Sequence, residues 1–130
     1  MFYIHPDNPQ VRLLEQVVNL LNNDGVIAFP TDSGYSLGCL LGNKRGVDRI
    51  SQIRQLDKHH NYTLMCKDLS ELSLYAHVDN VTFRLLKNNT PGQYVFILEA
   101  SKEVPRRLMN EKCKTIGLRI PDHKIDLAFL

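Results

Sequence analysis

The chain has 130 residues, enough for one ordinary domain, and 43% of them are hydrophobic while 23% are charged. This composition excludes disordered, collagen-like and coiled-coil chains, and the apolar runs are too short to cross a bilayer. The net charge is only +2, but acidic residues predominate in 1–43 and basic residues in 102–124. Cys39, Cys66 and Cys113 form no CxxC pair, which predicts a cytoplasmic protein with buried, unreactive thiols and no zinc site.

Apolar residues spaced three and four apart predict a first helix. They are Val11, Leu14, Val18 and Leu21. Asn8 can cap this helix, with Pro9 in its first position, since asparagine accepts hydrogen bonds from unpaired N–H groups and proline has a helical φ. Gly25 is expected to end the helix in a left-handed turn.

Two strands are expected after this helix. The wholly apolar run 26–29, stopped by Pro30, predicts a short strand buried on both faces. The segment 35–41 predicts a second strand with Gly38 inside it. Glycine within a strand indicates a bulge or the close approach of another group.

The rest of the chain continues the alternation of helices and strands. Asp68 can form a capping box with Glu71, and Asp79 can cap a further helix. The expected elements are, in order, helix 47–56, strand 63–66, a helix after Asp68 through Tyr75, a helix after Asp79 that ends before Pro91, strand 94–98, a basic helical turn at 105–109 and strand 115–120. This order indicates the α/β class with a mixed sheet.

The last residues carry an apolar helical pattern. Ile125, Leu127, Ala128 and Leu130 follow Pro121-Asp122 at helical spacings. Because such a face needs something to pack against, we expect residues 1–130 to form a single domain that lacks its C-terminal part. We also expect such a chain to expose apolar surface and to self-associate.

The loop after the 26–29 strand carries the side chains best suited to bind a ligand. Thr31, Ser33 and Tyr35 lie there with Asp32, at a strand end, where open α/β sheets bind ligands. Hydroxyl groups and backbone N–H groups at such a place can bind phosphate, ribose or an amino acid. The alternative is an ordinary loop in which Asp, Ser and Gly form turns.

The segment from Pro30 to Gly38, followed by a helix that ends in a basic residue, resembles the opening signature of the YrdC/YciO family. Further stretches resemble its YciO branch, in order along the chain: 3–9, 53–56, 61–66, 88–92, 102–107 and 117–121. The resemblance covers essentially the whole chain. It implies a twisted, open mixed sheet with flanking helices, one concave basic face, and association with double-stranded RNA.

The resemblance also implies a chemistry. Enzymes of this family make L-threonylcarbamoyl-AMP from threonine, bicarbonate and ATP, for a modification of tRNA. Thr31 would contact the threonine, Arg54 would lie near the phosphates, and Asp32 would form a turn or hold Arg54. The substrate- and nucleotide-binding residues implied are Thr31, Ser33, Tyr35, Arg54, Asn61 and Arg119. Magnesium would accompany ATP, and no tightly bound cofactor is expected.

Three positions depart from the pattern of the enzymes. Leu56 stands where they carry a second basic residue, Cys66 where many have a histidine or another polar residue, and Val95 where they have a threonine. The family's later motif of serine and asparagine lies further on than residue 130. We therefore expect binding of an ATP- or adenylate-type nucleotide and of double-stranded RNA, with weakened or absent synthase activity. The alternatives are a competent synthase and a non-catalytic adaptor that binds RNA or the ribosome.

Six basic residues are candidates for contacts to the phosphates of duplex RNA, because proteins recognise such duplexes by shape and backbone charge. They are Arg45, Arg49, Arg106, Arg107, Lys112 and Lys114. The alternative is that these side chains only solvate the surface of the protein.

Overall fold

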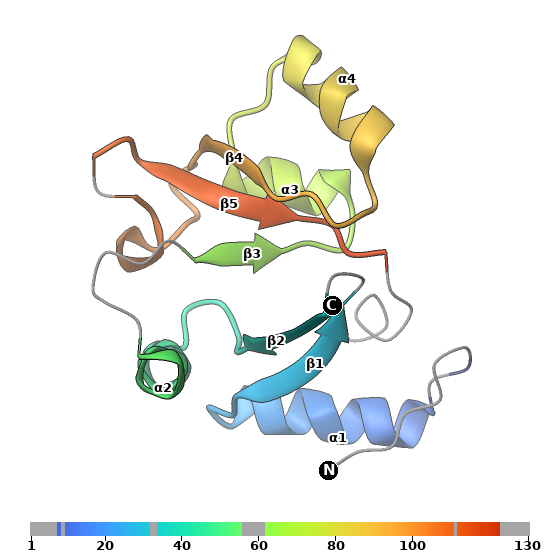
Figure 1. The fold of residues 1–130 in the computed structure, drawn as a ribbon, viewed down its shortest axis with the longest axis vertical. Coiled ribbons are helices and arrows are strands. Elements are labelled where there is room, and N and C mark those ends of the chain that lie inside the picture. The colour runs from blue at the N-terminus through green and yellow to red at the C-terminus, as the bar shows by residue number, and fades with distance from the viewer. Residues whose placement is uncertain (1–7, 9, 32–33, 56–61, 111, 123–130) are drawn as a thin grey trace. The chain divides into compact units, whose positions relative to one another are not determined.

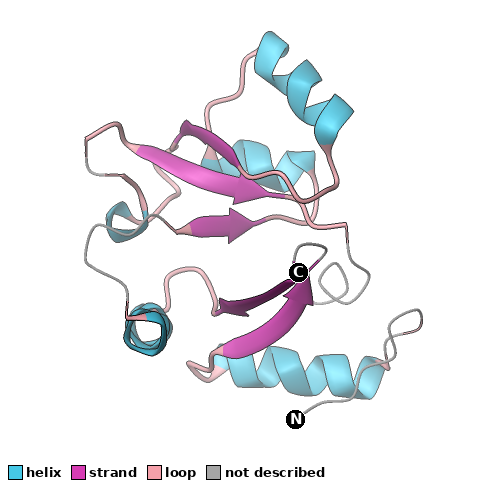
Figure 2. Cartoon of the chain, viewed as in Figure 1, coloured by secondary structure: helices cyan, strands magenta, loops and turns pink. Residues whose placement is uncertain are grey.

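The computed structural model describes residues 8, 10–31, 34–55, 62–110 and 112–122 (Figure 1). Helices and strands alternate along the chain and form one two-stranded antiparallel sheet and one three-stranded mixed sheet, which confirms the predicted α/β class (Figure 2). The described residues divide into a first unit, up to residue 55, and a second unit, 62–122. The apolar pattern of the last eight residues lies outside the described part of the chain.

The first unit contains helices α1 (Val11–Asn22) and α2 (Lys44–Arg54) and strands β1 (Ile27–Thr31) and β2 (Gly34–Gly38). The two strands pair antiparallel, with Ile27 opposite Gly38 and Thr31 opposite Gly34. β1 does not stop at Pro30 as expected, because a proline is tolerated in a strand where its missing N–H is not needed for pairing. β2 ends at Gly38, three residues earlier than expected.

Strand β1 is buried on one face rather than on both. Phe29 and Thr31 are buried, while Ala28 is exposed and Pro30 is half-buried, in keeping with the alternation of side chains in a strand. The ring of Phe29 lies over Gly38, where an added Cβ would come within 2.7 Å of Phe29 Cε1. The close approach expected at Gly38 is therefore confirmed.

Both ends of α1 differ from the prediction. The helix begins at Val11 with Gln10 at the N-cap position and no side-chain cap, so Asn8 does not cap it. At the other end Asp24, not Gly25, takes the left-handed conformation, with φ +63°. The Gly25 N–H donates to the Leu20 carbonyl at 3.0 Å, and a Cβ at Gly25 would overlap the Leu20 side chain. Glycine is thus needed at position 25 because the backbone there lies against Leu20, and not because the position requires a left-handed φ.

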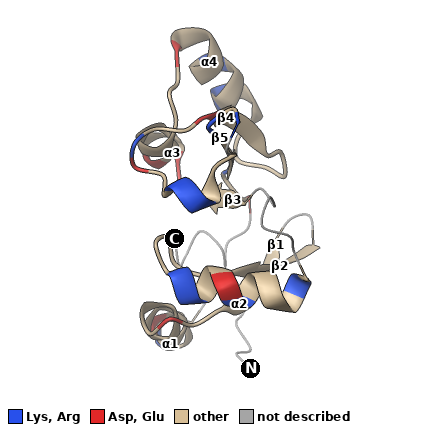
Figure 3. Ribbon diagram, turned by 90° about the vertical axis from the view of Figure 1, so that its left-hand side faces the viewer, with Lys and Arg blue, Asp and Glu red and all other residues tan. Residues whose placement is uncertain are grey.

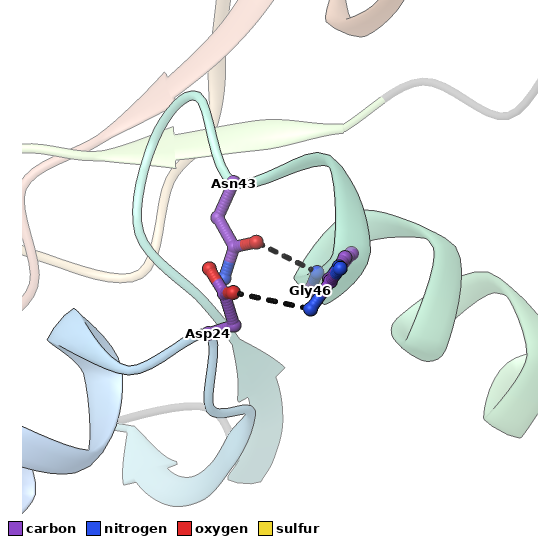
Figure 4. A network of polar contacts seen from close by, with 4 residues as sticks. Asp24, Asn43 and Gly46 are labelled. Atoms are coloured by element: carbon purple, nitrogen blue, oxygen red, sulfur yellow. Dashed lines mark hydrogen bonds and ion pairs between the residues drawn. The ribbon is translucent and has the colours of Figure 1, made fainter.

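Helix α2 begins at Lys44 rather than at residue 47 because Asn43 caps it (Figure 4). Asn43 Oδ1 accepts a hydrogen bond from the Gly46 N–H at 3.1 Å. The helix ends at Arg54 because the next residue, Gln55, has φ +53°. Val47 and Ile50 are buried as expected, whereas Ile53 is 50% exposed.

The second unit contains three strands and three helical segments. They are β3 (Thr63–Met65), α3 (Leu69–Tyr75), α4 (Asn80–Asn89), β4 (Phe96–Glu99), the 3₁₀ turn η1 (Arg106–Leu108) and β5 (Thr115–Arg119). The two helix caps are confirmed: Asp68 Oδ1 accepts from the Glu71 N–H at 2.8 Å, and Asp79 Oδ1 accepts from the Thr82 N–H at 2.7 Å. The strands β3, β4 and β5 are each one residue shorter than expected, and β4 begins two residues later and ends one residue later than predicted.

Strand β5 lies between the other two strands of the second unit, parallel to β3 and antiparallel to β4. Its even-numbered residues Ile116 and Leu118 belong to a buried core with Leu72 and Leu86 of the helices, and α3 lies against one side of the strands (Figures 1 and 3). Its odd-numbered residues face the opposite side, because successive side chains of a strand alternate.

Gly46 lies in the first turn of α2, against Cys39. An added Cβ would be 2.6 Å from Cys39 Cβ and 2.8 Å from Asn43 Nδ2. In an ordinary helix Gly→Ala stabilises the protein, but here we expect Gly46→Ala to lower the free energy of unfolding by about 1–3 kcal/mol through overpacking. Urea denaturation measures this change.

Gly92→Ala is the matched control, because the nearest atom to its added Cβ is Asn89 O at 3.7 Å. We expect its free energy of unfolding to change by less than about 0.5 kcal/mol. A Gly46→Ala protein more stable than the parent would show that the contact with Cys39 is not tight.

Candidate functional site

The hairpin of the first unit holds Thr31 at the end of β1, where it is buried. The Thr31 hydroxyl donates to the Gly34 carbonyl at 3.0 Å, across the turn. This bond fixes the direction of the hydroxyl group and closes the hairpin.

Tyr35 lies one residue beyond the same turn, opposite Pro30, and is 83% exposed. Because Tyr35 pairs with Pro30 and Thr31 pairs with Gly34, the Tyr35 ring and the Thr31 side chain lie on opposite faces of the hairpin. An exposed phenol ring can stack on a planar group or donate a hydrogen bond. Asp32 and Ser33 stand between Thr31 and Gly34 in the sequence, and both lie outside the described residues, as do Leu56 and Asn61.

Arg54 is the last residue of α2, and its side chain is exposed. A cation in the last turn of a helix interacts favourably with the helix dipole. Lys and Arg also lie toward the start of α2 (Figure 3), where Arg45 Nη1 is 3.8 Å from Asp24 Oδ2 (Figure 4). Both partners of this pair are mostly exposed, so the pair adds little to stability.

Arg119 belongs to the second unit, at the end of β5, and is 7% exposed. Its Nε–H donates to the Gly92 carbonyl at 3.2 Å, and its own carbonyl accepts from the Cys66 N–H at 2.8 Å. Its partner in the parallel pair is Met65. The structure thus places this predicted ligand residue on a buried strand and in a fixed orientation. Thr31, Tyr35 and Arg54 belong to the first unit.

The odd-numbered face of the second unit's sheet brings together residues that the sequence does not single out. In the registers of β5 with β3 and β4, Gly117 lies opposite both Thr63 and Ile97. An added Cβ at Gly117 would be 3.0 Å from Thr63 Oγ1 and 3.1 Å from Val95 Cγ1. A hydroxyl group and a methyl group therefore converge over one backbone position. The sequence signals this arrangement only through the strand pattern of residues 115–119, in which every second side chain faces the same side of the sheet.

The three thiols lie in three different environments. Cys66 is fully buried, and burial, with the nearby Glu71 and Asp68 carboxylates, raises its pKa to about 12. Cys39 is partly buried, and burial raises its pKa as well. Cys113 is exposed, which corrects the expectation that all three thiols are buried.

Four of the six basic residues predicted to contact RNA lie close together along the second unit. Arg106 and Arg107 form η1, and Lys112 and Lys114 follow it; all four side chains are exposed. Asn110 shapes the turn between them: its Oδ1 accepts from the N–H groups of Lys112 and Cys113, each at 3.0 Å. Its carbonyl accepts from the Lys114 N–H at 2.9 Å. The other two predicted residues, Arg45 and Arg49, are exposed on α2 in the first unit.

Metal ligands and membrane spans were also sought in the described ranges. There, no group of three or more His, Cys, Asp or Glu side chains could hold a metal ion. Of the histidines only His77 is described, and it is exposed. None of the described helices is both long and apolar enough to span a membrane.

Residues 19–130 match the Sua5/YciO/YrdC family, which is described as "telomere recombination". The chain therefore belongs to this family, as the motifs in its sequence predict. Within the family it is 62% identical, over 129 residues, to the uncharacterized protein YciO of Escherichia coli strain K12. The crystal structure of E. coli YciO superposes with a TM-score of 0.95 and confirms the fold.

More distant members of the family carry functional names. A threonylcarbamoyl-AMP synthase of Vibrio vulnificus is 26% identical over 118 residues, which are 88% of this chain and 63% of that enzyme. The crystal structure of P. abyssi Sua5 complexed with L-threonine shares the fold, with a TM-score of 0.85 at 22% identity over 94% of this chain and 36% of that one. The alignment with E. coli YciO covers 99% of this chain and 63% of that protein.

The environments of the thiols predict their order of reaction. With a pKa of about 12, Cys66 is a thiolate in about one molecule in ten thousand at pH 8, and the thiolate is the reactive form. We expect iodoacetamide to modify Cys113 in the folded protein and to reach Cys66 only after unfolding in urea. Peptide mass spectrometry at successive times measures this order. Rapid modification of Cys66 in the folded Cys113→Ser protein would contradict its burial.

Proposed function

We propose that this chain forms the nucleotide- and amino-acid-binding part of a YciO-type protein that also binds double-stranded RNA, with weakened or absent threonylcarbamoyl-AMP synthase activity. Membership of the family and the distant likeness to a named synthase support the two ligand classes. The fold shared with a Sua5 structure that holds L-threonine supports the amino acid as one of them.

The environment of Cys66 is the observation that supports weakened or absent synthase activity. Cys66 stands where many of the enzymes have a histidine or another polar residue that contacts the amino acid. Here the side chain is fully buried and its pKa is about 12, so it presents neither a charge nor a surface to a ligand. Val95 stands where the enzymes have a threonine, so at this position a methyl group replaces a hydroxyl.

The nucleotide would bind through the first unit. Thr31 is buried at the end of β1 with its hydroxyl direction fixed, the Tyr35 ring is exposed, and Arg54 offers a guanidinium that can form charge-assisted hydrogen bonds to phosphate. ATP would arrive as its magnesium complex, so this metal is part of the substrate. Leu56, two residues after Arg54, leaves the phosphates with one cation fewer than in the enzymes.

Calorimetry with ATP and AMP tests the role of Arg54. We expect Arg54→Ala to weaken nucleotide binding by roughly 1.5–3 kcal/mol, the contribution of a hydrogen bond to a charged group. Thr31→Ala should weaken it by about 1 kcal/mol and also loosen the hairpin, which thermal unfolding would report. Arg12→Ala, an exposed arginine of α1, is the matched control.

Three results would decide among the candidate functions. If all these variants bind ATP as the parent does, the proposed nucleotide site is wrong. If the parent binds no nucleotide at all, the chain is a non-catalytic adaptor. Release of pyrophosphate from ATP that depends on threonine, at the rate of an authentic synthase, would instead establish a competent enzyme.

Binding of duplex RNA is tested at the second unit. Arg106→Ala/Arg107→Ala should lower the affinity for duplex RNA and make the slope of log K against log salt concentration less steep. The reason is that fewer counterions are released on binding when fewer phosphates are contacted. Fluorescence anisotropy over a range of salt concentrations measures both quantities. The control is Arg84→Ala/Lys87→Ala, which removes two exposed charges from α4 of the same unit. Equal loss of affinity in both double variants would show that general charge, and not this surface, binds the duplex.

A further inference from the structure

Four hydrogen bonds converge on Asn110, the residue that opens the turn between η1 and β5. Its Oδ1 accepts from the N–H groups of Lys112 and Cys113, each at 3.0 Å. Its carbonyl accepts from the Lys114 N–H at 2.9 Å, and its own N–H donates to the Thr115 carbonyl at 2.8 Å. The side chain and both backbone groups of Asn110 therefore bind the turn, which closes on this one residue.

The chain on either side of this turn is anchored to the second unit. Val104 and Leu108 bracket the arginines of η1 and are buried, at 3% and 6% exposed. After the turn, the Lys114 carbonyl accepts from the Ala100 N–H at 2.9 Å, next to the pairing of β5 with β4. The turn is thus held between two fixed points.

The backbone bound to Asn110 carries two exposed cations, Lys112 and Lys114. Lys114 has φ +54°, a left-handed conformation that is uncommon for a lysine, and its N–H is bonded to the Asn110 carbonyl in this conformation. The place of a lysine ammonium group depends first on the backbone that carries it. A segment that is already ordered also loses less conformational entropy when a partner binds.

We propose that Asn110 is the positioning residue of the surface formed by Arg106, Arg107, Lys112 and Lys114. This inference rests on the proposed function, since it concerns how that surface holds duplex RNA. Proteins recognise such duplexes by the shape of the backbone, so cations at a fixed spacing bind better than the same cations on a loose segment. Asn110 carries no charge and acts only through the backbone that it orders.

Fluorescence anisotropy with duplex RNA over a range of salt concentrations tests this role. Asn110→Ala removes two hydrogen bonds and no charge. We expect its Kd for the duplex to rise about five- to tenfold, the cost of immobilising one or two loosened side chains on binding. The slope of log K against log salt concentration should stay unchanged, because no cation is lost. Lys112→Ala/Lys114→Ala should instead make that slope less steep, by about one for each lost phosphate contact.

Two more variants complete the series. Asn110→Ser is the conservative variant: a serine hydroxyl forms the same kind of turn more weakly, so its Kd should lie between those of the parent and Asn110→Ala. Asn89→Ala is the matched control, because Asn89 is also half-buried and its Nδ2 donates to the Leu85 carbonyl of α4 at 2.7 Å. Its Kd should equal that of the parent.

Two measurements without RNA accompany the binding data. Amide hydrogen exchange at Lys112 and Cys113 should be faster in Asn110→Ala than in the parent, because both N–H groups lose their acceptor. Thermal unfolding checks that each variant is folded at the temperature of the binding experiment.

The outcomes separate the positioning role from the proposed function. If the parent binds the duplex and Asn110→Ala binds it equally well, or if Asn89→Ala loses as much affinity, the positioning role is wrong and the proposed function stands. If Asn110→Ala does not fold, Asn110→Ser decides: parental affinity together with faster amide exchange overturns the role. If the parent binds no duplex RNA at any salt concentration, the RNA-binding part of the proposed function is wrong, and the positioning role fails with it.

Discussion

Backbone hydrogen bonding to β5 is the constraint on which the second unit depends. β3 and β4 both pair with it, and the bonds continue past its two ends: Asn110 N–H donates to Thr115 O at 2.8 Å, and Gly92 N–H donates to Ile120 O at 2.9 Å. Because buried peptide groups must be paired, these bonds set where each neighbouring segment can lie. One strand therefore fixes the turn that carries Lys112 and Lys114, the loop that reaches Arg119, and the side chains over Gly117.

In the first unit, close packing at glycines has the corresponding role. Gly38 leaves room for the ring of Phe29, and Gly46 leaves room for Cys39 beneath the first turn of α2. These contacts join β1 to β2 and the loop after β2 to α2. They hold the hairpin with Thr31 and Tyr35, and the helix that ends at Arg54, in one unit. Close-packed interiors tolerate few changes in volume, so the positions of the residues proposed to bind the nucleotide depend on these two glycines.

The chemistry proposed for this chain follows from where polar groups are missing. A synthase must stabilise charge on phosphates and hold a polar amino acid, and each task needs preorganised polar groups. Cys66 is buried and neutral, and Val95 and Ile97 are apolar and exposed. These properties are the basis of the proposal that the chain binds a ligand of the family and has weakened or absent synthase activity. The chain spans less than two thirds of E. coli YciO, so these statements concern the part of the site that it contains.

The sequence by itself determined what depends on near neighbours. The caps at Asp68 and Asp79, the 3₁₀ turn at Arg106, the mixed α/β class and the family motifs all follow from residues a few positions apart, and the structure or the comparisons confirm them. Local signals failed at α1, where Asn8 has the right chemistry but lies two residues before the actual N-cap position. The burial of Cys66 was also predicted from the sequence and is confirmed, whereas only the tertiary structure decided the exposure of Cys113 and the meeting of Thr63 and Val95 over Gly117. These depend on strand register between segments that are 20 to 55 residues apart in the chain, and a register shift of one residue would turn every side chain to the other face.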